Sequence, residues 1–283
     1  IARQVLIIQS QDLHVRRGLD DTVHQMRVAI RRLRSTLRVF GPLFDDQWAD
    51  ELRDELGWLA AELGAARDAE VMQQRLIASV AGLRKVDNND RTLAESEIVA
   101  AMTRSATAGR TRSTKAMHSP RYIALMQSLV QAAAAPHFDP AADANCSKAL
   151  LPLVKDAWRE LERDVDGLRR KGRDESWHEA RIQAKRVRYA VDAVAPVFGK
   201  PASKFGSRLG KVTELLGRHQ DAAIAATEAH SIATRSEADP AAAFVLGRLH
   251  DATRAEVAQA RRMFLDLWPT VADPHLRRWL RRG

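Results

Sequence analysis

The sequence predicts an all-α fold, because alanine and arginine are abundant and no convincing strand pattern occurs along its 283 residues. Proline-containing pairs divide the chain into amphipathic helical stretches, and each pair predicts the start or the end of a helix. These pairs are Gly41-Pro42, Ser119-Pro120, Asp139-Pro140, Gly199 to Pro201, Asp239-Pro240, Trp268-Pro269 and Asp273-Pro274. Hydrophobic residues make up 45% of the chain, so it can bury one large core or two smaller ones.

The first distinctive element is a basic segment, Thr22 to Phe44, which contains five arginines, one histidine and no acidic residue. On a helix its basic residues form a stripe roughly 80° wide, with Arg32 to one side. The stripe consists of His24, Arg27, Arg31, Arg34 and Arg38. Apolar residues between Met26 and Phe40 take the opposite face. Like charges one turn apart each destabilise an exposed helix by roughly 0.2–0.5 kcal/mol, so an anion from outside the helix is expected.

The next stretch is acidic and allows two interpretations. Its carboxylates are Asp45, Asp46, Asp50, Glu51, Asp54 and Glu55. They could hold a divalent ion, but they alternate with Arg53 and precede Trp58, which favours a solvated helix face. Further along, a glycine in the segment Leu63 to Asp68 permits the close approach of another helix. Asp68 would either orient an arginine of the basic helix or form a buried structural pair.

A connection follows at Ala132 to Asp143, where four alanines precede two prolines. It divides the chain into two parts of similar length. We therefore expect a first helical bundle at residues 1–137 and a second at residues 138–283.

A second basic segment, Trp177 to Val194, repeats the first one. An offset of 154 residues aligns the basic positions: His24 with His178, Arg27 with Arg181, Arg31 with Lys185, Arg32 with Arg186, and Arg34 with Arg188. The formal net charge of +9 equals the number of arginines and lysines that these two segments contribute. They are Arg27, Arg31, Arg32, Arg34, Arg38, Arg181, Lys185, Arg186 and Arg188. The positive excess is thus predicted to lie in two helices, with Tyr189 as an aromatic neighbour.

The repeat extends beyond the basic helices. With an offset of 153, Leu63 to Asp68 aligns with Leu216 to Asp221, so these segments are additional candidates for the site through Arg67 and His219. Just upstream of the second copy, further cations are spaced three and four residues apart. Lys204, Arg208 and Lys211 would extend the basic surface if their helix packs beside the second basic segment.

A focused basic surface without interleaved acids indicates a polyanionic partner. Arginine suits phosphate oxygens, and cations about 5.4 Å apart along a stripe suit a linear phosphate polymer. Duplex DNA or RNA is a less favoured alternative, because aromatics for base stacking are few. No glycine-rich phosphate loop, serine-hydrolase elbow or HExxH pair occurs, so neither an enzyme nor a cofactor or metal site is predicted. The alternative to a binding protein is an enzyme: a metal-dependent hydrolase of polyphosphate or of a triphosphate, in which the acidic cluster would hold the metal.

The single cysteine, Cys146, excludes an internal disulfide and is typical of a reducing compartment. No apolar run approaches 18 residues and no signal peptide opens the chain. We therefore expect a cytoplasmic protein with no membrane span.

Two strings carry a resemblance to a known family. VHQMRVAIRRLRSTLRVF at Val23 to Phe40 and WHEARIQAKRVRYAVDAV at Trp177 to Val194 resemble the paired signature of the CHAD family, the conserved histidine α-helical domain. LGAARDAEV at Leu63 and LGRHQDA at Leu216 are similar to that family's later motifs. The resemblance covers essentially the whole chain.

The resemblance implies two antiparallel helical bundles, related by a pseudo-twofold axis, with a shared basic groove or central passage. It also implies binding of inorganic polyphosphate without catalysis, with polyphosphate granules as a place of association. One wall would be formed by His24, Arg27, Arg31, Arg32, Arg34 and Arg38, and the other by His178, Arg181, Lys185, Arg186, Arg188 and Tyr189. A triphosphatase domain of the CYTH type often precedes such chains, and its ExExK signature is absent here.

Overall fold

The computed structural model describes residues 1–17, 22–235 and 239–281, and it confirms the all-helical fold. Helices account for nearly all of these residues, and no strand occurs among them. A single backbone bridge pairs Phe44 with Phe138 at the connection between the two parts of the chain.

The first part contains a short helix, the basic helix and a long hairpin. Their bounds are α1 Ala2–Arg16, α2 Thr22–Val39, the 3-10 turn η1 Gly41–Leu43, α3 Asp46–Ala81, α4 Asn88–Met117 and α5 Pro120–Ala134. Polar caps begin two of these helices. Ser119, at a predicted helix start, accepts a hydrogen bond from the backbone of Tyr122 and caps α5. Asp45 accepts one from the backbone of Trp48 and caps α3, a start that the proline pairs did not predict.

The second part repeats this order of elements after η2 Pro140–Asp143. Its helices are α6 Cys146–Asp166, α7 Asp174–Phe198, α8 Lys200–Ala233, α9 Pro240–Val271 and the C-terminal 3-10 segment η3 Pro274–Arg281. One predicted boundary is wrong, because α9 continues through Pro269 to Val271. Gly199 separates α7 from α8 with a φ of 69°, a conformation that glycine adopts without steric cost.

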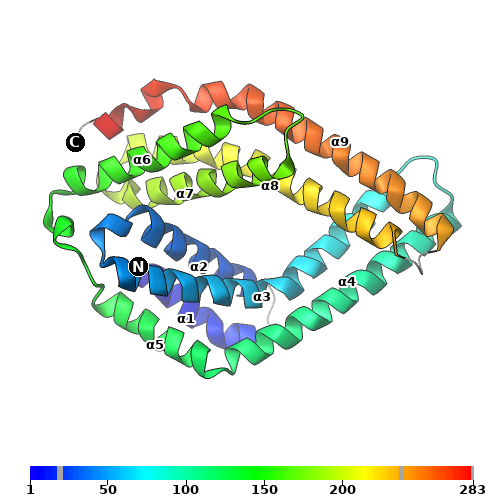
Figure 1. The fold of residues 1–283 in the computed structure, drawn as a ribbon, viewed down its shortest axis with the longest axis horizontal. Coiled ribbons are helices and arrows are strands. Elements are labelled where there is room, and N and C mark those ends of the chain that lie inside the picture. Colours follow the sequence, from blue (N-terminus) through cyan, green and yellow to red (C-terminus); the bar gives the residue numbers. More distant parts are fainter. Residues whose placement is uncertain (18–21, 236–238, 282–283) are drawn as a thin grey trace.

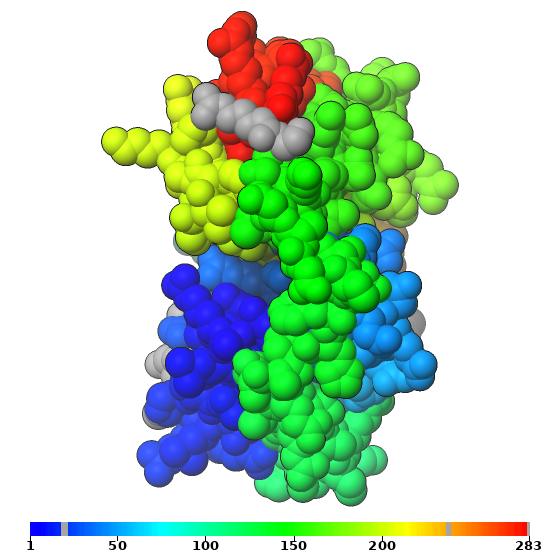
Figure 2. Space-filling view, turned by 90° about the vertical axis from the view of Figure 1, so that its left-hand side faces the viewer, coloured from blue at the N-terminus to red at the C-terminus, as the bar shows by residue number. Residues whose placement is uncertain are grey.

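The basic helices α2 and α7 pack against each other where the two halves meet, on the left in Figure 1. From there the hairpins α3–α4 and α8–α9 extend to the opposite end, where α4 contacts α9. The side view shows the connection from α5 to α6 running from the lower to the upper half of the molecule (Figure 2).

The main hydrophobic core crosses from one half to the other. It includes Ile30 and Leu33 of α2 together with Val187 and Val191 of α7, all fully buried. A second core lies at the far end of the hairpins and joins α3 and α4 to α8 and α9. The shared core fixes α2 relative to α7, so the space between their basic faces is set by packing on their apolar faces.

Candidate functional site

A groove with a volume of about 410 Å³ lies between α2 and α7, with one wall residue from α3. Seven of its lining residues are cationic and none is acidic. The full lining consists of Arg31, Arg34, Ser35, Arg38, Arg53, Arg181, Ile182, Lys185, Arg186 and Tyr189. The two predicted walls therefore meet along part of their length.

The helical periodicity places these side chains on the face of each helix that borders the groove. On α2 the opposite face is fully buried from Met26 to Leu37 and faces the core. On α7, Ala180 and Ala184 are fully buried and have small side chains, which lets the helix lie close to its neighbours. Lys185 and Tyr189 then fall one turn apart on the side that faces α2.

Most of the groove cations have no carboxylate partner. Within the described ranges, no ion pair involves Arg31, Arg34, Arg38, Arg181, Lys185 or Arg186. In addition, the Nε atoms of Arg31, Arg34 and Arg181 are buried without a hydrogen-bond partner. Buried donors without partners are rare in folded proteins, so these three point to an acceptor that a ligand would provide.

The electrostatics of the groove favour the same conclusion. Burial lowers the pKa of Arg34, Arg181 and Arg186 from the usual arginine value. Burial also lowers the pKa of Lys185 to about 8, with further contributions from Arg181 and Arg31. A polyanion in the groove would stabilise every one of these charges.

Lys185 and Tyr189 also line a second cavity, of about 570 Å³, between α7 and α8. Arg188 and Lys211 belong to this cavity rather than to the groove, and Arg188 donates to Thr213 Oγ1 at 2.9 Å. Arg32 lies on the flank, with its guanidinium 5.8 Å from the centre of the Tyr189 ring. Arg32 thus forms a contact between α2 and α7, as its position on the side of the stripe suggests.

Arg27 is committed to a partner within the chain. Its Nη atoms donate to both carboxylate oxygens of Asp68, at 2.6 and 3.0 Å. The side chain lies across Gly64, where a Cβ atom would come within 2.7 Å of the guanidinium carbon. Asp68 is 64% exposed, so this contact orients the arginine and is not a buried pair.

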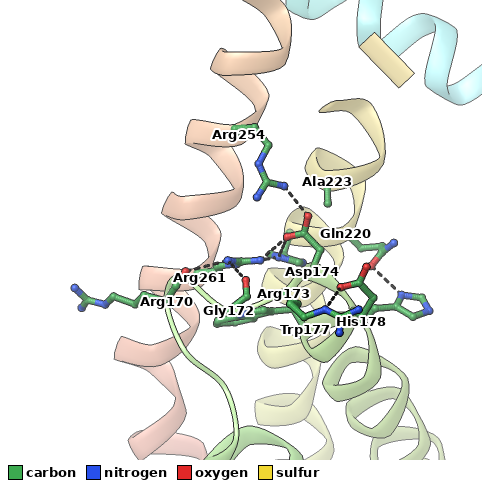
Figure 3. Close-up of polar contacts among 12 residues, drawn as sticks. Arg170, Gly172, Arg173, Asp174, Trp177, His178, Gln220, Ala223, Arg254 and Arg261 are labelled. Carbon is green, nitrogen blue, oxygen red and sulfur yellow. Dashed lines mark hydrogen bonds and ion pairs between the residues drawn. The ribbon is translucent and has the colours of Figure 1, made fainter. Parts of the chain in front are cut away.

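The two signature histidines lie outside the groove. His24 lines a separate cavity of about 530 Å³, together with Arg67 of α3 and His118, which directly follows α4. Nδ1 of His178 lies 2.8 Å from Oε1 of Gln220 on α8 (Figure 3). Both histidines stay candidates for ligand contact, although neither lines the groove.

His219 is buried and does not extend the basic surface. It is 1% exposed, stacks on Trp177 and accepts a hydrogen bond from Nε of Arg261 at 3.1 Å. Burial, followed by the charge of Arg261, lowers the pKa of His219 to about 4, so the ring is neutral at physiological pH. Its place in the motif reflects packing against the start of α7.

That start is held by Asp174, the first residue of α7 (Figure 3). Its carboxylate accepts from Arg254 at 2.6 Å and from the buried Arg261, both on α9. Arg261 also donates to the carbonyl oxygens of Arg170 and Gly172, each at 2.9 Å. The network fixes the turn that leads into the second basic helix.

None of the five additional candidates lines the groove, and Lys204 and Arg208 also lie outside the adjoining cavity between α7 and α8. Lys204 lines a different cavity with His275 and Trp279, near the C-terminal segment. Arg208 is half-buried on α8 and lines neither the groove nor the cavity between α7 and α8. Lys204 and Arg208 therefore do not extend the basic surface, whereas Lys211 lies in the cavity next to the groove.

The sequence did not predict that Arg53 lines the groove. Arg53 belongs to α3, where it forms an ion pair with Asp50 at 2.7 Å, and its acidic surroundings suggested a solvated face. Three further carboxylates of this stretch each contact a different partner: Asp45 caps α3, Glu51 accepts from Gln47, and Glu55 binds Arg121. The hydrogen bond from Arg121 is the main reason that the pKa of Glu55 is lowered. Across residues 1–17, 22–235 and 239–281, no three His, Cys, Asp or Glu side chains are grouped as a metal site.

No helix in these ranges is both long and apolar enough to cross a bilayer.

Known proteins with similar sequences place this architecture in a family. The family model described as CHAD domain matches residues 1–230. Two proteins of Mycobacterium tuberculosis, the uncharacterized proteins MT2285 and Rv2226, are each 30% identical to the chain over 232 residues. The match covers 79% of the chain but only 43% of each relative, so the chain spans less than half the length of these proteins.

Solved structures agree with the family match. The structure of PptA from Streptomyces chartreusis superposes with a TM-score of 0.83 at 26% identity, covering 95% of this chain and 96% of that one. The CHAD domain from the plant Ricinus communis superposes with a TM-score of 0.66 at 29% identity, covering 90% and 87% of the two chains. The chain therefore belongs to the CHAD domain family.

Proposed function

We propose that the groove between α2 and α7 binds inorganic polyphosphate and leaves the polymer intact. The observation that carries this proposal is the set of six groove cations without an ion-pair partner among the described residues. Three of them also have a buried Nε atom without an acceptor. A flexible polymer of phosphates would provide closely spaced acceptors along the whole set.

The shape and lining of the groove favour polyphosphate over nucleic acid. Tyr189 is the one aromatic residue in the lining, and its ring lies 5.8 Å from Arg32. The groove therefore offers little surface on which bases could stack. Arginine forks and the Lys185 amine instead match phosphate oxygens, and release of the polymer's counterions would drive association.

The proposal is specific about which predicted residues contact the polymer. The residues that would bind directly are Arg31, Arg34, Arg38, Arg181, Lys185 and Arg186. Arg27 would act only through its contact with Asp68, which keeps the first turns of α2 in place. Where polyphosphate collects in cytoplasmic granules, the chain would bind there by the same contacts, alone or beside a CYTH-type triphosphatase.

The experiment is a competition titration at physiological salt. Labelled long-chain polyphosphate is bound to the protein and displaced with unlabelled polyphosphate, duplex DNA, single-stranded RNA, heparin or triphosphate. We expect unlabelled polyphosphate to displace the label at least about tenfold more effectively than duplex DNA, and the label to be recovered intact with Mg²⁺ present. Equal displacement by every polyanion, or shortening of the label, would refute the proposal.

The matched variants remove two positive charges in each case. Arg31→Ala with Lys185→Ala changes the groove, whereas Arg121→Ala with Arg159→Ala removes exposed arginines that pair with acids on α3 and α6. We expect the first pair of substitutions to weaken binding by roughly tenfold or more and the second to change it by less than about twofold. Similar losses in both would show that net charge rather than the groove controls binding.

A further inference from the structure

Lys185 occupies a distinctive position between the two cavities of α7. It lines the groove with α2 on one side and the cavity with α8 on the other. Within the described chain its amine forms neither a hydrogen bond nor an ion pair. The charged groups around it come from three helices: Arg181 and Arg188 on α7, Arg31 on α2 and Asp221 on α8.

We propose that Lys185 is a modification site, at which a small acyl phosphate bound by the groove arginines transfers its acyl group to the lysine amine. This inference rests on the proposed function only in that both assign phosphate binding to the same arginines. The ligand class follows from the lining, in which one lysine amine shares a groove with arginines. An acyl phosphate carries its reactive carbonyl one oxygen away from a dianionic phosphoryl group, so it matches both kinds of side chain.

The reaction needs no further reactant. The neutral amine of Lys185 attacks the carbonyl carbon, and a nitrogen–carbon bond forms. The bond between that carbon and the bridging phosphate oxygen breaks, and inorganic phosphate leaves with the electron pair. The proton lost by the nitrogen goes to the departing phosphate or to water. The products are an Nε-acyl lysine and inorganic phosphate, without oxidation or reduction.

The surroundings of Lys185 favour this reaction in two ways. First, the groove volume of about 410 Å³ admits a small acyl phosphate, and Arg31 and Arg181 present donors that would hold its phosphoryl group. Second, burial and the neighbouring arginines lower the pKa of Lys185 to about 8. Compared with a pKa of 10.5, roughly two orders of magnitude more of the amine is then neutral and nucleophilic near pH 7.5.

Lys211 and Lys204 provide internal comparisons. Both are exposed on α8; Lys211 lines the cavity next to Lys185, and Lys204 lies in a different cavity. Neither lines the groove between α2 and α7. A reagent that merely reacts with accessible lysines would modify these two at least as quickly as Lys185.

Acylation would also regulate polymer binding. It removes the positive charge at the centre of the groove and adds an apolar group to a surface that otherwise attracts phosphate. Polyphosphate bound in the groove would in turn shield Lys185 from the acyl donor. The modification and the polymer therefore exclude each other.

The test uses the full chain and acetyl phosphate, with site-resolved rates from peptide mass mapping. We expect Lys185 to be acetylated at least about tenfold faster than Lys204 or Lys211 near pH 7.5, with a rate that saturates as acetyl phosphate increases. The Lys185 rate should level off above about pH 8, the pKa of that amine, whereas the rates of the exposed lysines continue to rise. Above about pH 8, where the Lys185 amine is neutral, Arg181→Gln should lower the acetylation rate of Lys185 and leave that of Lys204 unchanged.

Three results would overturn the inference: equal rates at the three lysines, a Lys185 rate that stays linear in acetyl phosphate, or no effect of Arg181→Gln. Failure of the proposed function is distinguishable, since polyphosphate affinity is measured separately on unmodified protein. If polyphosphate binds but Lys185 is not preferred, only this inference fails. If Lys185 is preferred but polyphosphate neither binds nor protects it, only the proposed function fails.

Discussion

Lys185 is the residue from which we expect the pH dependence of binding. Its pKa of about 8 is below the ordinary lysine value of 10.5, chiefly because of burial. Between pH 7 and 9 the amine of the free protein loses its charge, so polyphosphate affinity should fall over this interval. Titration calorimetry at pH 7, 8 and 9 measures the effect, which we expect to be several-fold.

The stability of the free protein should change in the opposite direction. Between pH 8 and 10.5 the unfolded chain binds a proton at this lysine and the folded chain does not, so the contribution of Lys185 to the free energy of unfolding increases with pH.

The control for the binding prediction is Lys185→Arg, which retains the charge and should give a polyphosphate binding constant that is nearly independent of pH. A several-fold loss of affinity in Lys185→Arg between pH 7 and 9 would assign the effect to another group.

Arg261 is a second residue whose environment makes a quantitative prediction. Its side chain is 4% exposed, and Asp174 is the carboxylate that neutralises it (Figure 3). Asp174→Ala leaves this guanidinium buried without a counterion and should lower the free energy of unfolding by roughly 2–4 kcal/mol. Denaturant titration measures the change.

The control for Asp174→Ala is Asp156→Ala on α6. Asp156 pairs with Arg159, and both side chains are 59% exposed, so its loss should cost under about 0.5 kcal/mol. Comparable losses in the two variants would contradict the assignment of Asp174 as the residue that holds the start of α7.

At the scale of elements, α3 supports the arginines of α2 through its glycines. A Cβ atom at Gly57 would come within 3.1 Å of an Nη atom of Arg34 and 3.2 Å of its guanidinium carbon. Gly57→Ala should displace this flexible side chain while improving helix propensity by up to about 1 kcal/mol. We expect polyphosphate affinity to fall several-fold with no loss of thermal stability, as binding assays and calorimetry would show. Loss of stability together with affinity would indicate a packing defect instead.

The contact between α3 and α4 depends on a different glycine. A Cβ atom at Gly109 would lie 2.4 Å from the backbone nitrogen of Ala66, so the two helices would have to separate. Gly109→Ala should destabilise the protein by roughly 1–3 kcal/mol. In contrast, nothing lies within 4 Å of a Cβ atom at Gly247 in α9, and Gly247→Ala should be neutral or stabilising. Thermal unfolding measures the two variants: the midpoint should fall in Gly109→Ala and stay the same or rise in Gly247→Ala. Equal changes in the midpoint would refute this account of the contact.

The elements themselves were largely predictable from local pattern. The apolar stripe of α2 identified the buried face, and Met26, Ile30, Leu33 and Leu37 are all fully buried. The pattern failed at Pro269, where α9 absorbs a proline in its last turn, close to a terminus where few backbone hydrogen bonds depend on it.

Membership of the site was less predictable than the helices. The stripe of α2 placed His24 with Arg31, yet these residues line different cavities, because side chains of α1, α3 and α4 form the cavity beside the first turn of α2. His219 looked like a surface cation, and its burial depends on Trp177 and Arg261, which are far from it in sequence. Arg53 likewise lines the groove only because α3 packs beside α2. Such contacts between distant segments leave no local signal.

At the scale of the whole molecule, the duplicated unit creates a site that neither half contains alone. Arg31, Arg34 and Arg38 come from the first half, and Arg181, Lys185 and Arg186 from the second. Their mutual repulsion opposes packing of α2 on α7, whereas the core shared by the two helices favours it. A polyanion that enters the groove removes the repulsion, so bound polymer should raise the thermal stability of the intact chain.

This arrangement predicts how binding depends on salt. Each cation that neutralises a phosphate contributes roughly 0.7 to the negative slope of log affinity against log salt for a single-stranded polyanion. Six unpaired groove cations therefore give a slope of about −4, and Arg31→Ala with Lys185→Ala should reduce its magnitude by about 1.4. Arg121→Ala with Arg159→Ala removes the same net charge outside the groove and should leave the slope unchanged. Titrations at four salt concentrations separate these outcomes. Equal slopes for the two double variants would mean that the polymer follows the surface as a whole, because only contacts within the groove make the slope depend on which cations are removed.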